Sequence, residues 1–138
     1  MANVVDSLVL ENDGIVYKQR YLVLSDGTAM TDEIMIDKST LTSKVTGQEP
    51  HALDLMELEA VGWGTMNSVL LEWDHTIDDE ILAFGVTGGG VKWCPKLGNL
   101  KDPVSGGGTG DIIITTNGLA ANAGFMIVAT WRLRTLTA

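Results

Sequence analysis

The sequence contains little cysteine and little proline, and it has no long hydrophobic run. Cys94 is the only cysteine among 138 residues, so a scaffold held together by disulfides is excluded. No apolar run approaches the ~18 residues that a membrane-spanning helix needs, and we expect no membrane partner. Residues Met1–Asp13 have no positively charged n-region and carry three acidic side chains, so no secretory signal is expected.

Basic residues are also scarce. The chain has 18 acidic and 9 basic side chains, which give a formal net charge of -9. A surface this acidic repels phosphate groups, so we expect no nucleic-acid partner. The 45% hydrophobic and 20% charged content is that of an ordinary globular protein, and the length predicts one domain over residues 1–138.

Glycine is abundant, with 16 residues, and it divides the chain into short runs. The dipeptides Asp13-Gly14, Asp26-Gly27 and Asn117-Gly118 favour tight hairpin turns, because both of their residues tolerate positive φ. The runs between such turns are rich in β-branched and aromatic residues, which favour strands. The clearest expected strands are Val4–Leu10, Ile15–Leu24, Thr28–Asp37, Val69–Asp74, Glu80–Val86, Val91–Trp93, Ile112–Thr116 and Phe125–Leu133.

Two segments have an irregular pattern. In Ile15–Leu24 the apolar face changes between Tyr17 and Leu22, which predicts a bulge or a strand that crosses between sheets. His51–Val61 contains residue types that favour a helix, but its apolar positions fit neither the helical nor the strand period. We interpret it as a strand, with a helix as the alternative, because a hairpin to Val69–Trp73 across a glycine-rich turn fits the surrounding pattern.

The pattern as a whole predicts an all-β fold. About eight short strands with turns every 8–15 residues indicate an antiparallel sandwich or barrel. Gly85–Gly110 is expected to form long glycine-rich loops around the short strand at Val91–Trp93. Long loops in a compact domain are commonly functional or mobile.

The four tryptophans divide into two pairs. Trp73 and Trp131 lie on the apolar faces of their predicted strands, and we expect both in the core. Trp63 and Trp93 sit beside glycine or proline in predicted loops. A place in the core, a protein interface or a sugar-stacking role remains open for these two.

A search for catalytic and metal-binding motifs finds none. His51, His75 and Cys94 are scattered, so no zinc site is expected. The glycine run at Gly88–Gly90, followed by Lys92, leads into a predicted strand and lacks the Ser/Thr hydroxyl of a phosphate-binding loop. We therefore expect no enzyme activity, no cofactor and no metal.

Two groups of charged residues need a separate interpretation. The acidic run containing Asp74, Asp78, Asp79 and Glu80 offers oxygen ligands for calcium, or it is a solvated link between two strands. Arg132 and Arg134 lie two residues apart on one predicted strand, so they point in the same direction. They face either the acidic residues of a partner or solvent.

Parts of the sequence are similar to small virion proteins of tailed bacteriophages. In Ser68–Asp74 and Thr76–Leu82, a strand ending in Leu-Glu-Trp-Asp leads through a short polar link to the next apolar strand. In the closing section, Gly-Asp-Ile begins an apolar run over Gly110–Gly118, and the strand Phe125–Arg134 ends in Leu-Arg. The resemblance covers roughly residues 51–134.

This resemblance implies a jelly-roll-like β-sandwich that serves as a head decoration (cement) protein. It implies the major capsid protein as the partner, homo-oligomers with a trimer favoured, and a place on the capsid surface of the virion after assembly in the host cytoplasm. The alternatives are a tail, neck or fibre module, or a lectin-like carbohydrate-binding sandwich.

The expected contacts are the N-terminal segment, with residues 1–10 as a possible arm, and the loops of Gly85–Gly110. The candidate interface residues are Val4, Val5, Leu8, Trp93, Arg132 and Arg134.

Overall fold

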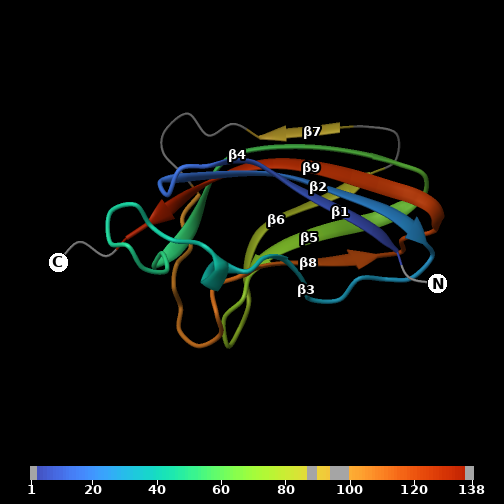
Figure 1. Ribbon diagram of the computed structural model, residues 1–138. Coiled ribbons are helices and arrows are strands. Elements are labelled where there is room, and N and C mark those ends of the chain that lie inside the picture. The colour runs from blue at the N-terminus through green and yellow to red at the C-terminus, as the bar shows by residue number, and fades with distance from the viewer. Residues whose placement is uncertain (1–2, 87–89, 94–99, 136–138) are drawn as a thin grey trace.

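The computed structural model describes residues 3–86, 90–93 and 100–135. Cys94 and the pair Gly88-Gly89, considered above, lie outside the described residues. The strands are β1 (Val4–Asn12), β2 (Val16–Asp26), β3 (Glu33–Ile36), β4 (Ala52–Trp63), β5 (Met66–Trp73), β6 (Asp79–Val86), β7 (Gly90–Trp93), β8 (Ile112–Asn117) and β9 (Ala121–Arg134) (Figure 1). One 3-10 turn, η1 (Lys38–Thr40), follows β3. The described residues contain no helix long and apolar enough to cross a membrane.

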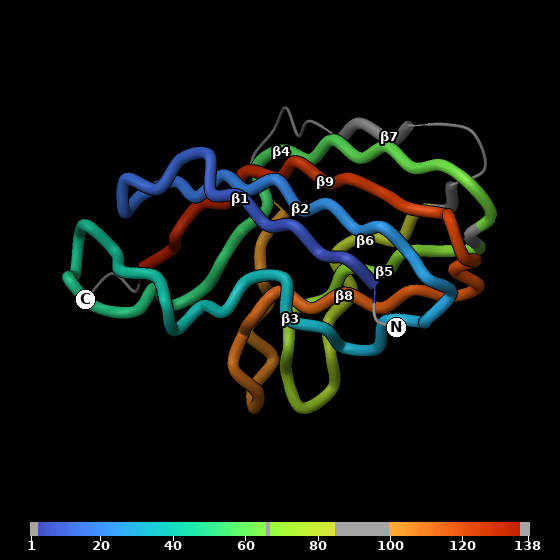
Figure 2. The backbone as a smooth tube through the Cα atoms, turned by 45° about the vertical axis from the view of Figure 1, so that its right-hand side comes forward, coloured from blue at the N-terminus to red at the C-terminus, as the bar shows by residue number. Residues whose placement is uncertain are grey.

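The strands form two antiparallel sheets that face each other (Figure 2). Sheet A has the order β1-β2-β9-β4-β7, and sheet B has the order β3-β8-β5-β6. Strands β2 to β9 therefore make two four-stranded layers, with most successive strands on opposite layers. This is the arrangement of a jelly roll. The predicted all-β, jelly-roll-like sandwich is confirmed.

Strand β1 is an addition to this eight-stranded arrangement. The segment that was considered as an arm pairs with β2 from Val4↔Leu24 to Asn12↔Tyr17. The turn at Asp13-Gly14 joins the two strands, as predicted for a hairpin. The N-terminal segment is thus the edge strand of sheet A.

The other two predicted hairpins are wrong. Asp26-Gly27 leads from β2 in sheet A to β3 in sheet B, and Asn117-Gly118 leads from β8 in sheet B back to β9 in sheet A. The glycine-rich link from β4 to β5 likewise changes sheet. Gly27 and Gly118 do have positive φ angles, 99° and 70°. A glycine-containing turn predicts that the chain reverses. It does not determine whether the next strand pairs with the previous one or lies in the facing sheet.

The irregular segment around His51–Val61 is a strand, as interpreted. The register of β4 against β9 shifts between Leu55 and Glu57, which leaves Met56 as a bulge. Leu53 and Leu55 are buried before the bulge, and Leu58 is buried after it. One extra residue in the strand moves the apolar positions from one parity to the other, which explains why neither period fitted.

The predicted bulge in β2 is wrong. Tyr17, Gln19, Tyr21 and Val23 alternate without a break, and all four are buried towards sheet B. The shifts in the registers of β2 lie elsewhere, between residues 9 and 11 of β1 and between residues 24 and 26 of β2. Leu22 therefore lies on the opposite face of the strand, away from the core.

The core fills the space between the sheets. Trp73 and Trp131 are buried, as predicted, and so is Phe125. The Trp73 indole Nε1 donates a hydrogen bond to the Leu53 carbonyl at 2.8 Å, which links the end of β5 to the start of β4. This contact brings together the ends of strands that hold the polar cluster described below.

Candidate functional site

An apolar patch lies on the outer face of sheet A, the face turned away from sheet B. Val23 and Phe125 point inward and are fully buried, so their neighbours Leu24 and Gly124 face outward. The registers place four residues side by side in a first row: Val4, Leu24, Gly124 and Trp63. The next row is Asp6, Leu22, Met126 and Val61.

Much of this patch is open to solvent. Val4 is 60% exposed, Leu24 and Leu8 are 44%, Val61 is 42% and Trp63 is 37%. We define the apolar patch as these five residues with the half-buried Leu22, Met126 and Val128. Contiguous apolar side chains on a sheet surface mark interaction sites more often than scattered ones do.

Trp63 packs directly on the backbone of Gly124. A Cβ atom at Gly124 would lie 2.5 Å from Cζ2 of Trp63 and 2.6 Å from the Val23 carbonyl oxygen. Only glycine leaves room for the indole ring at this place. Trp63 is therefore held against the sheet at the edge of the patch, with part of its ring open to solvent.

The polarity of the outer face changes along the strands. The first two rows are apolar except for Asp6 at the β1 edge, which pairs with Arg20. Beyond them come a mixed row, Leu8, Arg20, Val128 and Glu59, and then a polar row, Glu11, Lys18, Thr130 and Glu57. The last row includes Arg132, which is exposed, beside the buried Asp54. One end of sheet A is thus apolar on its outer face, and the other end is charged.

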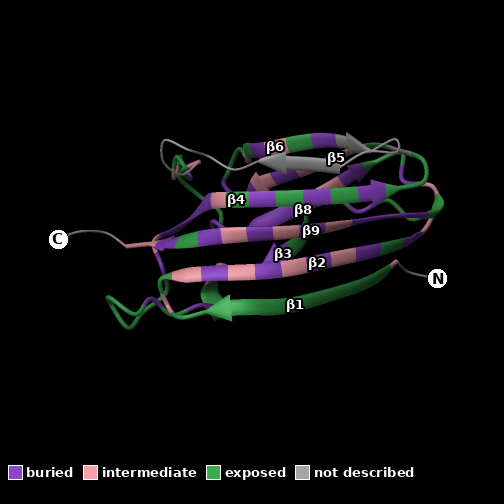
Figure 3. Cartoon of the chain, turned by 90° about the horizontal axis from the view of Figure 1, so that it is seen from above, coloured by how far each residue is buried: buried purple, intermediate pink, exposed green. Residues whose placement is uncertain are grey.

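Strand β1 is exposed along its whole length (Figure 3). Val5 and Val9 point to the inner side of sheet A, yet they are 46% and 50% exposed. Sheet B ends at the four-residue strand β3, so β1 overhangs the sandwich. Of the predicted interface residues, Val4, Val5 and Leu8 lie on this strand.

The other predicted interface residues lie apart from β1. Trp93 lies in β7, and its backbone pairs with Leu58 of β4. The side chain of Trp93 lies outside the described part of the structure. Arg134 is engaged within its own chain: Nη2 donates to the Asp102 carbonyl at 2.5 Å, and Nε lies 3.3 Å from Oδ2 of Asp54. We therefore do not assign Arg134 to an interface.

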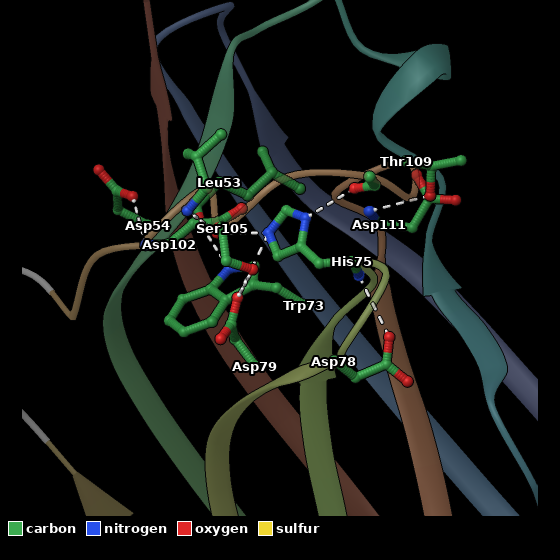
Figure 4. A network of polar contacts seen from close by, with 12 residues as sticks. Leu53, Asp54, Trp73, His75, Asp78, Asp79, Asp102, Ser105, Thr109 and Asp111 are labelled. Atoms are coloured by element: carbon green, nitrogen blue, oxygen red, sulfur yellow. Dashed lines mark hydrogen bonds and ion pairs between the residues drawn. The ribbon is translucent and has the colours of Figure 1, made fainter.

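A buried polar cluster occupies the charged end of the sandwich (Figure 4). His75 lies just after β5, and its ring reaches into the loop before β8. Nδ1 is 3.1 Å from the Gly107 carbonyl, and Nε2 is 2.7 Å from Oδ1 of Asp102. A carbonyl and a carboxylate only accept hydrogen bonds, so both ring nitrogens donate when the ring is the doubly protonated imidazolium.

The surroundings of His75 favour this charged form. Burial by itself would lower the pKa of His75, but the hydrogen bonds to Asp102 and Gly107 outweigh it. The negative charges of Asp102 and of Asp79, whose Oδ2 is 3.8 Å from Nε2, act in the same direction. Together they raise the pKa above its usual value, which favours the charged ring in the folded protein.

Asp54 connects the cluster to sheet A. Its Oδ1 accepts a hydrogen bond from the Asp102 backbone N–H at 3.0 Å, and its Oδ2 faces Arg134. Burial raises the pKa of Asp54, while the Asp102 N–H and the Arg134 charge oppose this rise. The chain from Arg134 through Asp54 and Asp102 to His75 ties β4 and β9 to the turn after β5.

The glycine-rich loop at residues 106–110 has the sequence of a simple turn, but in the structure it packs against the turn that carries His75. Gly108 has a φ of 65°, and a Cβ atom there would overlap the Asp74 carbonyl and lie 2.6 Å from Cα of His75. The Thr76 N–H donates to the Gly106 carbonyl at 3.1 Å. The loop thus lies directly against the turn that carries His75.

Among the described residues, two groups of side chains have the donor types of a metal site. His75, Asp79 and Asp102 have ligand atoms within 4.8 Å of one another, and so do Asp32, Glu72 and Asp78. The 2.7 Å separation of Nε2 and Oδ1 in the first group is that of a hydrogen bond, so a proton fits between them without a metal.

The acidic run considered for calcium does not converge on one point. The Asp74 carboxylate accepts from the Thr109 hydroxyl, and the Asp79 carboxylate accepts from Ser105. Asp78 accepts from the His75 N–H and joins the second metal-type group above. In that group, partial burial raises the pKa of Glu72, and the charges of Asp78, Asp32 and Glu80 add to the rise.

Sequence reasoning missed most of the apolar patch. The sequence pattern predicts Leu22 and Leu24 on the apolar face of Ile15–Leu24 after a change of phase, and it includes Val61 only as the end of His51–Val61. A signal was present in β2, because Tyr17–Val23 forms an unbroken alternation that leaves the two leucines on the opposite parity. Gln19 in the middle of that alternation hid the pattern.

Comparisons with known proteins give little guidance. No protein-family model matches the chain, and no curated protein matches it. One similar solved structure is a mutant of a family 29 carbohydrate-binding module, made to probe its ligand recognition. It has 5% sequence identity and a TM-score of 0.37, and the match covers 97% of this chain and 83% of that one. A likeness at this level carries no argument about function.

Proposed function

We propose that this protein is a structural component of a bacteriophage virion and acts as a capsid decoration (cement) protein. The observation that carries the proposal is the apolar patch, a contiguous apolar surface on the outer face of an otherwise acidic jelly roll. The free energy of the system falls when a partner covers such a surface, because apolar side chains leave water. The choice of partner comes from the resemblance to phage virion proteins, whose motif residues lie in β5–β6 and β8–β9.

The patch has the composition of a protein-binding surface. Trp63 at its edge is the residue type most enriched among those that dominate binding energy. Fully burying an exposed Val, Leu or Met side chain is worth about 1.5–3 kcal/mol. The exposed patch residues are 37–60% exposed, so each gains only part of this value and several must be covered together for docking. The polar row beside the patch, with Lys18 and Glu57, supplies the polar rim that interfaces commonly have.

A decoration protein of this kind stabilises the shell by mass action. It binds the assembled capsid and not the free subunits, so its binding free energy adds to the stability of the assembly. In this proposal its place is the capsid surface, and its partner is the major capsid protein across neighbouring subunits. A homotrimer remains the favoured oligomer, and sedimentation of the purified protein measures it.

The test is binding to purified head shells that lack the protein. Wild-type protein is expected to co-sediment with the shells and to raise their melting temperature. Leu24→Lys places a charge in the middle of the patch, on a side chain that is already 44% exposed, and should weaken binding at least 100-fold. Ile77→Lys is the matched control, because Ile77 is 82% exposed at the other end of the molecule and should bind as wild type does.

Other outcomes contradict the proposal. Shells that bind neither wild type nor control exclude a decoration role, and equal binding of Leu24→Lys excludes the patch as the docking surface. Cryo-electron microscopy of virions separates the alternatives within the phage. Copies that coat the shell support decoration, whereas copies at one vertex indicate a tail, neck or fibre module.

A further inference from the structure

The free side of β1 is an open strand edge. Among the described residues, no strand pairs with β1 on the side away from β2. Natural edge strands are commonly short, or they carry lysine, proline, inward-pointing charges or a β-bulge that prevents pairing. β1 has nine residues and neither lysine nor proline, and its register shift lies near its end, between Val9 and Glu11, so Val4–Val9 is a regular edge. Its five valines and leucines, Val4, Val5, Leu8, Val9 and Leu10, are 44–60% exposed.

A hollow lies beneath β1, between its inner face and the start of sheet B. It is lined by Asn3, Val5, Tyr21, Ala29, Met30 and Glu33, among others. The strand is held above the hollow by Gln19, whose Nε2 donates to Ser7 Oγ at 2.6 Å and to the Met35 carbonyl at 3.0 Å. The edge is therefore fixed in place, and both of its faces are open to a neighbouring strand's side chains.

Charge selects among the possible occupants of this edge. The charged residues of β1 are Asp6 and Glu11, and Glu33 lines the hollow on its inner side. The nearest basic residues, Lys18 and Arg20, lie on β2, and Arg20 is 3.4 Å from Asp6 there. A second copy of this chain would bring the same acidic strand and a further net charge of -9, so self-pairing is disfavoured.

We propose that β1 accepts an additional strand from another protein, an extended segment in which apolar residues alternate with lysine or arginine. Main-chain hydrogen bonds to the β1 edge supply the affinity. The basic residues of the segment lie on its outer face, towards Asp6 and Glu11, and its apolar residues lie on the inner face beside Val5 and Val9. This inference goes beyond the decoration role and does not rest on it, because strand addition at β1 is independent of which assembly carries the segment.

The experiment uses the full chain and a nine-residue peptide of alternating valine and lysine as the probe. Affinity is measured by fluorescence anisotropy of the labelled peptide, and amide hydrogen exchange by NMR reports on β1. We expect saturable binding and at least tenfold slower exchange of β1 amides. A valine–glutamate peptide tests the charge preference, and a valine–lysine peptide with a central proline tests the strand pairing. Both should bind at least tenfold more weakly.

Protein variants locate the site. Val9→Lys puts a charge on the inner side of the edge, at a residue that is 50% exposed. It should weaken binding of the valine–lysine peptide at least tenfold. Leu8→Lys makes the same change on the outer side of β1. Weaker peptide binding in both variants shows that the loss does not come from a local disturbance at one position. Val45→Lys, at a residue 74% exposed outside the sheets, is the matched control and should bind as wild type does.

Three results overturn the inference. The first is no protection of β1 at millimolar peptide. The second is equal binding of the glutamate peptide or of both β1 variants. The third is protection of β1 in the protein alone that disappears on dilution, which identifies a second copy as the occupant. Leu24→Lys should bind the peptide normally, so failure of head-shell binding and failure of strand addition are separate results.

Discussion

The two ends of sheet A invert the usual distribution of side chains. At one end, β4 and β9 present Val61, Trp63 and Met126 on the outer face, where apolar groups meet solvent. At the other end, the same two strands supply Asp54 and Arg134 to a cluster that is largely buried. The same strands therefore serve two purposes. Apolar groups outside prepare a surface for a partner, and charges inside fasten loops to the sandwich.

The two regions also differ in what completes them. Each member of the polar cluster finds its partner within the chain, from His75 and Asp102 to Arg134 and Asp54. The apolar patch has no covering segment among the described residues. The comparison indicates that the cluster acts on stability and the patch acts on binding, and each of the following changes separates the two effects.

The largest expected effect is on stability, from Asp102→Ala. The Asp102 carboxylate accepts from His75 and from the Val104 N–H while almost fully buried. Its removal leaves a buried imidazolium without its acceptor, and breaking such a pair costs about 3–5 kcal/mol. Urea unfolding measures the loss. Glu59→Ala, at an exposed residue of β4, should change stability little, and a similar loss in both variants would contradict the role of the cluster.

Trp63→Ala should reduce binding more than stability, the opposite of what is expected for Asp102→Ala. Truncating a tryptophan that dominates an interface costs about 2 kcal/mol or more in binding, so affinity for head shells should fall roughly 30-fold or more. The free energy of unfolding should change less, because the ring is already 37% exposed in the free protein. Co-sedimentation and urea unfolding on the same preparation test this. A large loss of stability with unchanged affinity would place Trp63 in the core.

Gly124→Ala tests the support of the patch without removing any patch residue. The added methyl overlaps the Trp63 ring and the Val23 carbonyl, and overpacking of this kind costs about 1–3 kcal/mol. We expect the indole to be displaced outward, with a shift in its fluorescence maximum and weaker binding to shells. An unchanged emission spectrum would show that the ring does not rest on Gly124.

The smallest expected effect is a pH dependence of the cluster. Because the pKa of His75 is raised in the folded protein above the unfolded value of about 6.5, its charged ring contributes stability that is fully present below that pH. The contribution is lost as the pH rises through the folded pKa, since the neutral ring donates from only one nitrogen. The loss should be about that of one hydrogen bond, ~1 kcal/mol.

Urea unfolding from pH 5.5 to 9 measures this decline. His75→Gln serves as the reference, because the two proteins differ only in the contribution of His75. A wild-type curve parallel to that of His75→Gln over this range would contradict the charged form. The apolar patch contains no titratable residue, so Trp63→Ala should leave the pH dependence unchanged.

Much of the fold was predictable from local pattern, and much of the candidate site was not. Strands such as Val69–Asp74 and Phe125–Leu133 follow from alternation, and the core positions of Trp73 and Trp131 follow with them. The bulge at Met56 interrupts the alternation in β4, and Gln19 puts a polar side chain among the buried positions of β2. Because Gln19 is polar, the inward positions of β2 were not recognised as one face, and a change of phase to Leu22 and Leu24 was predicted instead.

The sequence by itself determined an acidic, all-β chain with short strands, because composition and alternation act on each strand locally. Only the tertiary structure decided which turns cross between the sheets, which outer rows align into the apolar patch, and that His75 meets Asp102 at a separation of 27 residues. These features depend on register between strands distant in the chain. Register is fixed by how the two sheets pack, and no short stretch of sequence contains that information.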